Sequence, residues 1–110
     1  MAVAGQAELV FVVDLTSLTK KGFVGSTVYQ GKAVDLEFDD GDEGVVLSSE
    51  MAARLRVRKG SKILLAAENE HHIVTDAVVT ELGKAIRISN PKIYYEVGKE
   101  GGAILKIRKG

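Results

Sequence analysis

The sequence contains no cysteine and no tryptophan, and it has a single proline and few aromatic residues. Without cysteine, disulfides, thiol catalysis, iron–sulfur clusters and cysteine-ligated zinc are excluded, and a reducing compartment is the expected environment. Without tryptophan, the chain lacks the side chain best suited to anchoring a carbohydrate or membrane interface. Apolar residues make up 45% of the chain, so we expect a core of Val, Ile, Leu and Ala, in which the β-branched types favour strands.

Long hydrophobic runs are also absent. The longest unbroken apolar stretches, residues 9–13 and 63–67, are far shorter than the ~20 residues that span a bilayer. Residues 1–7 lack the basic start of a signal peptide, and we expect them to be flexible. These features predict a cytoplasmic protein. Asn and Gln number only two each, and this scarcity of thermolabile side chains predicts a thermophilic source.

The chain has no net charge, because fifteen acidic and fifteen basic residues cancel. It therefore lacks the overall electrostatic attraction that most nucleic-acid-binding proteins show. The charges are nevertheless separated along the sequence. An acidic segment, residues 35–43, holds six acidic residues and no basic one, and a basic segment, residues 54–62, holds five basic residues and no acidic one.

Short apolar stretches recur along the chain, separated by glycine-containing turns. Gly25 and Gly31 interrupt an alternating stretch that forms either one bent strand or two short ones. Ser48 or Ser49 is a suitable N-cap for a short helix over 50–55, and a one-turn segment is expected around Pro91. The expected strands are 8–14, 23–38 in one or two pieces, 45–47, 62–67, 72–79, 85–89 and 101–107. This spacing predicts a mainly β, closed or nearly closed structure in a single domain over 1–110.

The second part of the chain repeats the order of the first. A shift of 41 positions aligns six pairs of similar residues, five of which are identical. The pairs are Asp35 with Asp76, Leu47 with Ile88, Ser48 with Ser89, Gly60 with Gly101, Ile63 with Ile104 and Leu64 with Leu105. Each part has the order strand, strand, short helix, strand, which predicts an internal duplication.

The first repeat carries a recognisable pattern. It consists of Gly44, Val46, Ser48, Leu55, Val57, Gly60 and Ile63. This pattern resembles the half-motif of the cradle-loop barrels, a group that includes the AbrB-type transcription factors, the double-psi barrels and the RIFT barrels; Ser61 and Gly102 stand where the family usually has Asp. The resemblance implies a single cradle-loop-like β-barrel built from two pseudo-symmetric strand-strand-helix-strand halves, roughly 28–67 and 69–109. Two such units can close each other's open sheet edges.

The acidic segment partly matches a calcium-binding loop, with Asp39 at the first position and Glu50 at the twelfth. Gly41 stands at the third position, where the loop needs a ligand, and the preceding residues are typical of a strand rather than a helix. We therefore expect a solvated hairpin turn. Clustered like charges allow a weak divalent-ion site formed by Asp39, Asp42, Glu43 and Glu50.

The other motifs in the sequence do not point to a specific metal, phosphate or catalytic site. His71 and His72 are adjacent, so on a strand they point to opposite faces and are expected at the surface rather than at a metal. Residues 20–25 contain two lysines and a Gly-x-x-Gly, which favours a glycine-bent strand over a phosphate-binding loop. We find no nucleophile elbow and no dinucleotide fingerprint, and the sequence names no cofactor.

The basic segment is a candidate for contacts with phosphates or nucleic acid. Its basic residues are Arg54, Arg56, Arg58, Lys59 and Lys62. The leading functional hypothesis is a non-catalytic binding or assembly module that self-associates, with the acidic segment of one chain facing the basic segment of another. Two alternatives stay open: an AbrB-like DNA-binding regulator, and a RIFT-like enzyme that binds a nucleotide or flavin.

Overall fold

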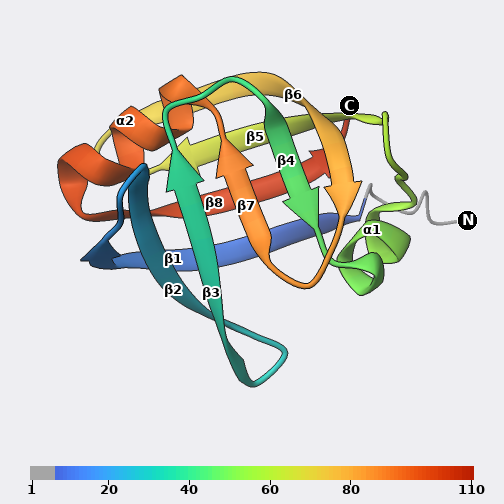
Figure 1. Ribbon diagram of the computed structural model, residues 1–110, viewed down its shortest axis with the longest axis horizontal. Helices are drawn as coiled ribbons and strands as arrows, with labels where there is room; N and C mark the ends of the chain where they lie inside the picture. The colour runs from blue at the N-terminus through green and yellow to red at the C-terminus, as the bar shows by residue number, and fades with distance from the viewer. Residues whose placement is uncertain (1–6) are drawn as a thin grey trace, which may run out of the picture.

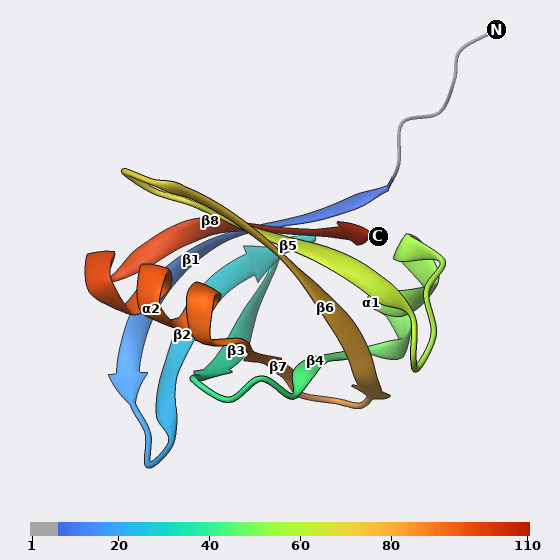
Figure 2. The ribbon, with the colours of Figure 1, turned by 90° about the horizontal axis from the view of Figure 1, so that it is seen from above.

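The computed structural model describes residues 7–110, so the flexibility predicted for residues 1–7 falls almost entirely outside the described part. Eight strands and two helices follow one another along the chain. The strands are β1 (Glu8–Leu18), β2 (Gly22–Tyr29), β3 (Lys32–Asp39), β4 (Gly44–Leu47), β5 (Lys62–Glu68), β6 (His72–Leu82), β7 (Ile86–Ser89) and β8 (Gly102–Lys109). The helices are α1 (Ser49–Leu55) and α2 (Pro91–Glu100), which lie at opposite ends of the barrel (Figures 1 and 2).

The strands close into a barrel in the order β1-β2-β3-β7-β4-β6-β5-β8. Most neighbours are antiparallel, but β3 pairs with β7 and β4 pairs with β6 in parallel. Strands β3, β4 and β7 form one side of the barrel, and β1, β8, β5 and β6 lie along the other (Figure 2). The prediction of a mainly β, closed structure is confirmed.

The first two strands differ from the expected boundaries. β1 continues to Leu18, because a bulge between Leu15 and Ser17 lets its polar end stay paired with β2. The alternating stretch that follows forms two strands in a hairpin rather than one bent strand. Gln30 and Gly31 both have positive φ at the hairpin tip, which suits a tight turn matched to the strand twist.

Helix α2 is the largest difference from expectation, since ten residues are helical where one turn was expected. Its boundaries follow common capping chemistry. The Asn90 side chain accepts hydrogen bonds from the N–H groups of Lys92 and Ile93, Pro91 occupies the first turn, and Gly101 ends the helix in the left-handed conformation. The shorter α1 was predicted correctly, with Ser48 as its N-cap.

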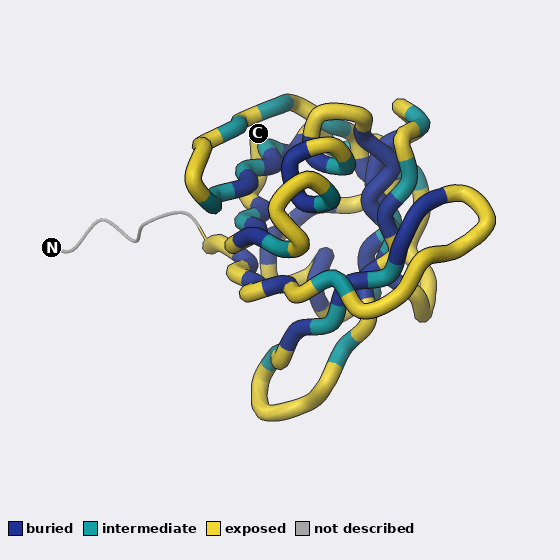
Figure 3. The backbone as a smooth tube through the Cα atoms, turned by 90° about the vertical axis from the view of Figure 1, so that its left-hand side faces the viewer, coloured by how far each residue is buried: buried dark blue, intermediate teal, exposed yellow. Residues whose placement is uncertain are grey.

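The core fills the inside of the barrel. Buried and exposed residues alternate along the strands, and the buried ones gather inside (Figure 3). All three phenylalanines are buried although the core was expected to be aliphatic, and the rings of Phe23 and Phe38 stack at 5.0 Å. Gly25 permits this packing, because a Cβ at that position would collide with Val13. Neither helix of the described residues is long and apolar enough to cross a membrane.

Candidate functional site

A polar clamp fastens the acidic segment to β7, and we define it as Asp39, Glu43, Arg87 and Ser89. The buried Ser89 hydroxyl donates to Asp39 Oδ1 at 2.6 Å and accepts from the Glu43 N–H at 3.3 Å. The Arg87 guanidinium lies 2.7 Å from Glu43 Oε2 and 3.9 Å from Asp39 Oδ2. Each member therefore has partners within the chain, and the single positive charge of Arg87 is shared between two carboxylates.

The predicted divalent-ion ligands do not gather at one point. Asp39 and Glu43 belong to the polar clamp, whereas Glu50 lies on α1 beside the β2–β3 hairpin. Oriented with its amide nitrogen toward Glu50, Gln30 donates to Glu50 Oε1 at 3.1 Å. Among residues 7–110, no three His, Asp or Glu side chains are close enough to hold a metal ion. Binding of a divalent ion here stays a prediction without a preformed set of ligands.

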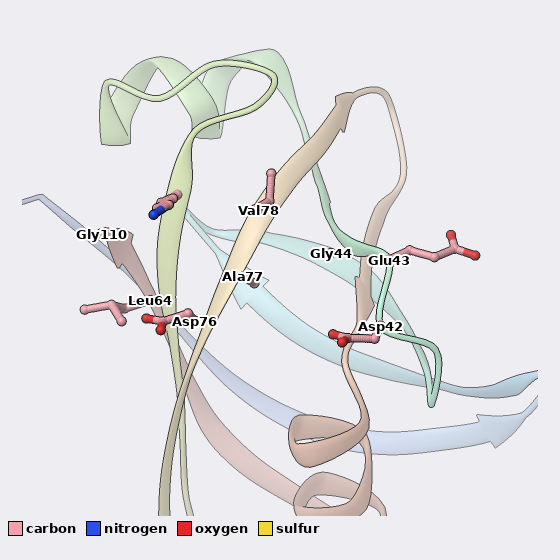
Figure 4. Close-up of a pocket in the computed structure, with 9 residues that line it drawn as sticks. Asp42, Glu43, Gly44, Leu64, Asp76, Ala77, Val78 and Gly110 are labelled. Carbon is pink, nitrogen blue, oxygen red and sulfur yellow. The ribbon is translucent and has the colours of Figure 1, made fainter.

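One end of the basic segment meets the acidic segment within the same chain. Asp42, Glu43 and Lys62 line a groove of about 620 Å³ between the β3–β4 loop and the start of β5. In Figure 4, Asp42 and Asp76 lie on opposite sides of this groove. The two segments therefore approach each other inside a single molecule, although no ion pair within 4 Å joins them across the described residues.

The other basic residues spread over the end of the barrel that carries α1. Arg54 lies on α1, where its guanidinium donates to the Gln30 side chain, and Arg56 ends the helix with a φ of 58°. Arg58 and Lys59 lie in the turn before β5. All four side chains are exposed, and none forms an ion pair within the part of the chain that the structure describes.

The two histidines have different acidic neighbours. His71 Nδ1 lies 3.4 Å from Glu96 Oε2, and His72 Nε2 lies 3.6 Å from Glu68 Oε1. The Glu96 oxygen is buried and lies close to His71, but the two atoms do not have the geometry of a hydrogen bond. Residues 20–25 form the β1–β2 turn and the start of β2, as the glycine-bent strand reading predicts.

An outer apolar face covers four adjacent strands, β1, β8, β5 and β6. We define it as Val10, Val12, Leu64, Ala66, Val74 and Ile104. The largest exposed fractions are 63% for Val12, 51% for Val74 and 47% for Val10. Val12 and Ile104 are direct cross-strand partners, and so are Ala66 and Val74. Lys106 lies between Val10 and Ala66, and Glu68 lies beside Ile104, so the apolar residues on β1 and β8 are separated from those on β5 and β6 by two charged side chains.

An ion pair lies in the middle of the outer apolar face. The Lys106 Nζ is 3.0 Å from Glu68 Oε2. The hydrogen bond from Lys106 lowers the pKa of the Glu68 carboxyl below its ordinary value, and the same bond raises the pKa of Lys106. Because each charge is balanced by its neighbour, the face is electrically neutral at its centre.

A second groove continues the outer apolar face toward α2. It has a volume of about 740 Å³, and His72, Val74, Pro91 and Tyr95 contribute to its walls. Tyr95 is 65% exposed, whereas the neighbouring Tyr94 packs on the core. The exposed apolar surface thus extends from β1 to α2.

Comparison with known proteins assigns no family: no family model matches the chain, and no curated protein or solved structure is similar to it at a significant level.

The outer apolar face is the feature that the sequence interpretation missed. The apolar run of residues 9–13 could have indicated it. On a strand, neighbouring residues point to opposite faces, so Val10 and Val12 point outward when Leu9 and Phe11 point inward. A run that is apolar in both phases of a strand indicates that both faces of the sheet are covered. Among residues 7–110, the chain covers the inner face of β1 but leaves Val10 and Val12 exposed on the outer face.

Proposed function

We propose that this protein is a non-catalytic assembly module that binds a second copy of itself through the outer apolar face. The observation that carries the proposal is the set of exposed apolar side chains on β1, β8, β5 and β6, which lie on both sides of a neutral ion pair. Burying such a surface against another sheet removes apolar area from water, and sheets pack readily face to face.

Charge favours a second copy as the partner. The outer surface of the same four strands carries four acidic and three basic side chains, which are Glu8, Asp14, Glu68, Asp76, Lys62, Lys106 and Arg108. A surface with nearly equal numbers of both signs repels its own copy only weakly, whereas a strongly charged partner finds no complementary field there. A twofold dimer buries the same patch on both chains.

Sedimentation at low and high salt tests this proposal and separates it from assembly driven by the acidic and basic segments. Salt screens exposed charges but leaves apolar burial intact. We expect a dimer that persists when the salt concentration is raised. Dissociation at high salt would favour contact between the acidic and basic segments, and a monomer at every protein concentration would contradict self-association.

We also propose that the barrel belongs to the cradle-loop type, with two related halves. The order β3-β4-α1-β5 is followed by β6-β7-α2-β8. A pseudo-twofold relation accounts for four pairings at once. It relates β4 to its antiparallel neighbour β7 and β5 to its antiparallel neighbour β8, and it converts the parallel pair β3–β7 into the parallel pair β6–β4. Superposition of the two halves in an experimental structure tests it, and failure to align β4 with β7 would contradict it.

DNA binding is a second candidate function, favoured by one observation. Arg56, Arg58 and Lys59 are exposed near the end of α1, and no acidic side chain within 4 Å neutralises them among the described residues. Such residues can neutralise backbone phosphates. A gel-shift assay at low salt tests this candidate: retardation that is lost in a variant with all three changed to Gln would support it, and no retardation would remove it.

A further inference from the structure

A small cavity lies where the β2–β3 hairpin, α1 and the start of β7 meet. Its volume is about 250 Å³, well below that of the outer grooves. Tyr29 and Lys32 line it from the hairpin, Glu50 and Met51 from α1, and Lys84 from the segment before β7. We call this space the hairpin cavity. It is independent of the outer apolar face, so the inference below does not rest on self-association.

The hairpin cavity carries an excess of positive charge. Lys32 and Lys84 line it against the single carboxylate of Glu50. Neither lysine has an ion-pair partner within residues 7–110. The Glu50 carboxylate accepts a hydrogen bond from the Gln30 side chain, which itself accepts one from the Arg54 guanidinium. Arg54 is therefore a third cation, connected to Glu50 through Gln30. The charge balance therefore favours an anion as the occupant.

Two hydroxyl groups near the hairpin cavity have no hydrogen-bond partner among residues 7–110. The Tyr29 hydroxyl is buried and unpaired, and so is the Thr27 hydroxyl two residues earlier on the same face of β2. Thr27 lies directly across from Val34, which also lines the cavity. Nearly all buried polar groups in proteins are hydrogen-bonded, so each exception calls for an explanation, of which a bound water or ligand is one. The Tyr29 ring packs on Phe11 at 5.5 Å, which fixes the position of its hydroxyl.

We propose that the hairpin cavity binds a small anion, with its phosphate or carboxylate group held by Lys32 and Lys84 and a hydrogen bond from the Tyr29 hydroxyl. Charge-assisted hydrogen bonds from two ammonium groups suit either anionic group. The volume of about 250 Å³ lies below the usual range for pockets that enclose drug-sized ligands, so we expect a small anion as the occupant.

Titration with inorganic phosphate and, separately, with succinate tests the proposal, with sodium chloride at equal ionic strength as the reference. Backbone amide signals of the full chain are followed by NMR. We expect saturable shifts confined to residues 27–34, 48–51 and 84–86 for at least one anion, and the anion that saturates identifies the preferred group. Shifts that do not saturate, or that spread over all basic residues, would overturn the proposal.

Three variants locate the site. Lys32→Gln and Lys84→Gln each remove one cation, and we expect each to weaken anion binding about tenfold, the loss of one charge-assisted hydrogen bond. Lys20→Gln is the matched control, because Lys20 precedes β2 at the end opposite to the hairpin tip, and it should bind as the unchanged protein does. Tyr29→Phe keeps the ring on Phe11 and removes only the hydroxyl.

The Tyr29→Phe variant distinguishes a ligand role from a packing role. We expect binding about tenfold weaker together with a melting temperature equal to or above that of the unchanged protein, since removing an unpaired buried hydroxyl relieves a cost. Unchanged binding in this variant, or in the Lys32→Gln and Lys84→Gln double variant, would overturn the assignment. Circular dichroism confirms that each variant remains folded.

Discussion

The two sides of the barrel differ in whether their side chains have partners within the chain. On the side formed by β3, β4 and β7, the polar clamp joins two carboxylates, a guanidinium and a hydroxyl within one chain. On the side formed by β1, β8, β5 and β6, valines and an isoleucine are exposed, and no other part of residues 7–110 covers them. The polar groups of the first side are paired within the chain, whereas the second side is the surface that we propose binds a partner.

This difference indicates where function is to be sought. The acidic segment attracts attention in the sequence because of its charge, yet Arg87 and Ser89 already occupy Asp39 and Glu43. No sequence motif marks the outer apolar face, but its apolar side chains are exposed and other described residues do not cover them. Groups whose interactions are satisfied within the fold stabilise it, whereas unsatisfied groups are available to a partner.

The largest effect is expected from comparing the inner and outer positions of a single strand. Phe11→Ala removes a fully buried ring from the core and should lower the free energy of unfolding by about 3–5 kcal/mol. Val12→Ala, at the next residue, should change the monomer's stability by about 0.5 kcal/mol or less, because its side chain faces solvent. Urea unfolding at low protein concentration measures both. Equal losses would show that β1 does not have distinct inner and outer faces.

A smaller loss is expected at the polar clamp. Asp39→Ala leaves the buried Ser89 hydroxyl and the Gly41 N–H without their acceptor, and it should cost about 2–3 kcal/mol. The matched control is Asp40→Ala, since Asp40 is the exposed neighbour and should cost about 0.5 kcal/mol or less. Thermal or urea unfolding compares the pair, and a loss at Asp40 as large as that at Asp39 would contradict the role given to the clamp.

The smallest effect concerns the ion pair on the outer apolar face. Because Lys106 lowers the pKa of Glu68, the pair's stabilisation is present above the ordinary carboxyl pKa and is lost as pH falls through the lowered value. At high pH it is lost as pH rises through the raised pKa of Lys106. NMR titration of the Glu68 carboxyl carbon should give a midpoint that rises in Lys106→Met. An unchanged midpoint would show that the pair does not form in solution.

Much of the fold could be predicted from local patterns. Alternation and glycine turns predict the strands, and Ser48 with the Met51 and Leu55 pair predicts α1. Helix α2 was underestimated because Gly98 and the paired tyrosines are weak helix formers, while the decisive Asn90 cap and tertiary packing act over its whole length. Helix boundaries that depend on both a capping residue and tertiary packing are hard to derive from helix propensity alone.

The candidate surfaces were less predictable. The outer apolar face depends on strands β1, β8, β5 and β6 lying side by side, an arrangement set by pairings between residues as far apart as Val12 and Ile104. The hairpin cavity likewise brings Lys32 and Lys84 together only through the parallel pairing of β3 with β7. No local pattern encodes either neighbourhood, so charge along the sequence directed attention to the acidic and basic segments instead.

The most direct test of the account is sedimentation equilibrium of the unchanged protein beside the Val12→Lys, Ile104→Lys double variant. These two residues are cross-strand partners on the outer apolar face, so two lysines there place like charges on both copies at a dimer contact. Leu18→Lys is the control, since Leu18 is exposed on the same strand beyond that face. The account predicts a dimer for the unchanged protein and the control, and a folded monomer for the double variant. A double variant that remains dimeric would contradict it.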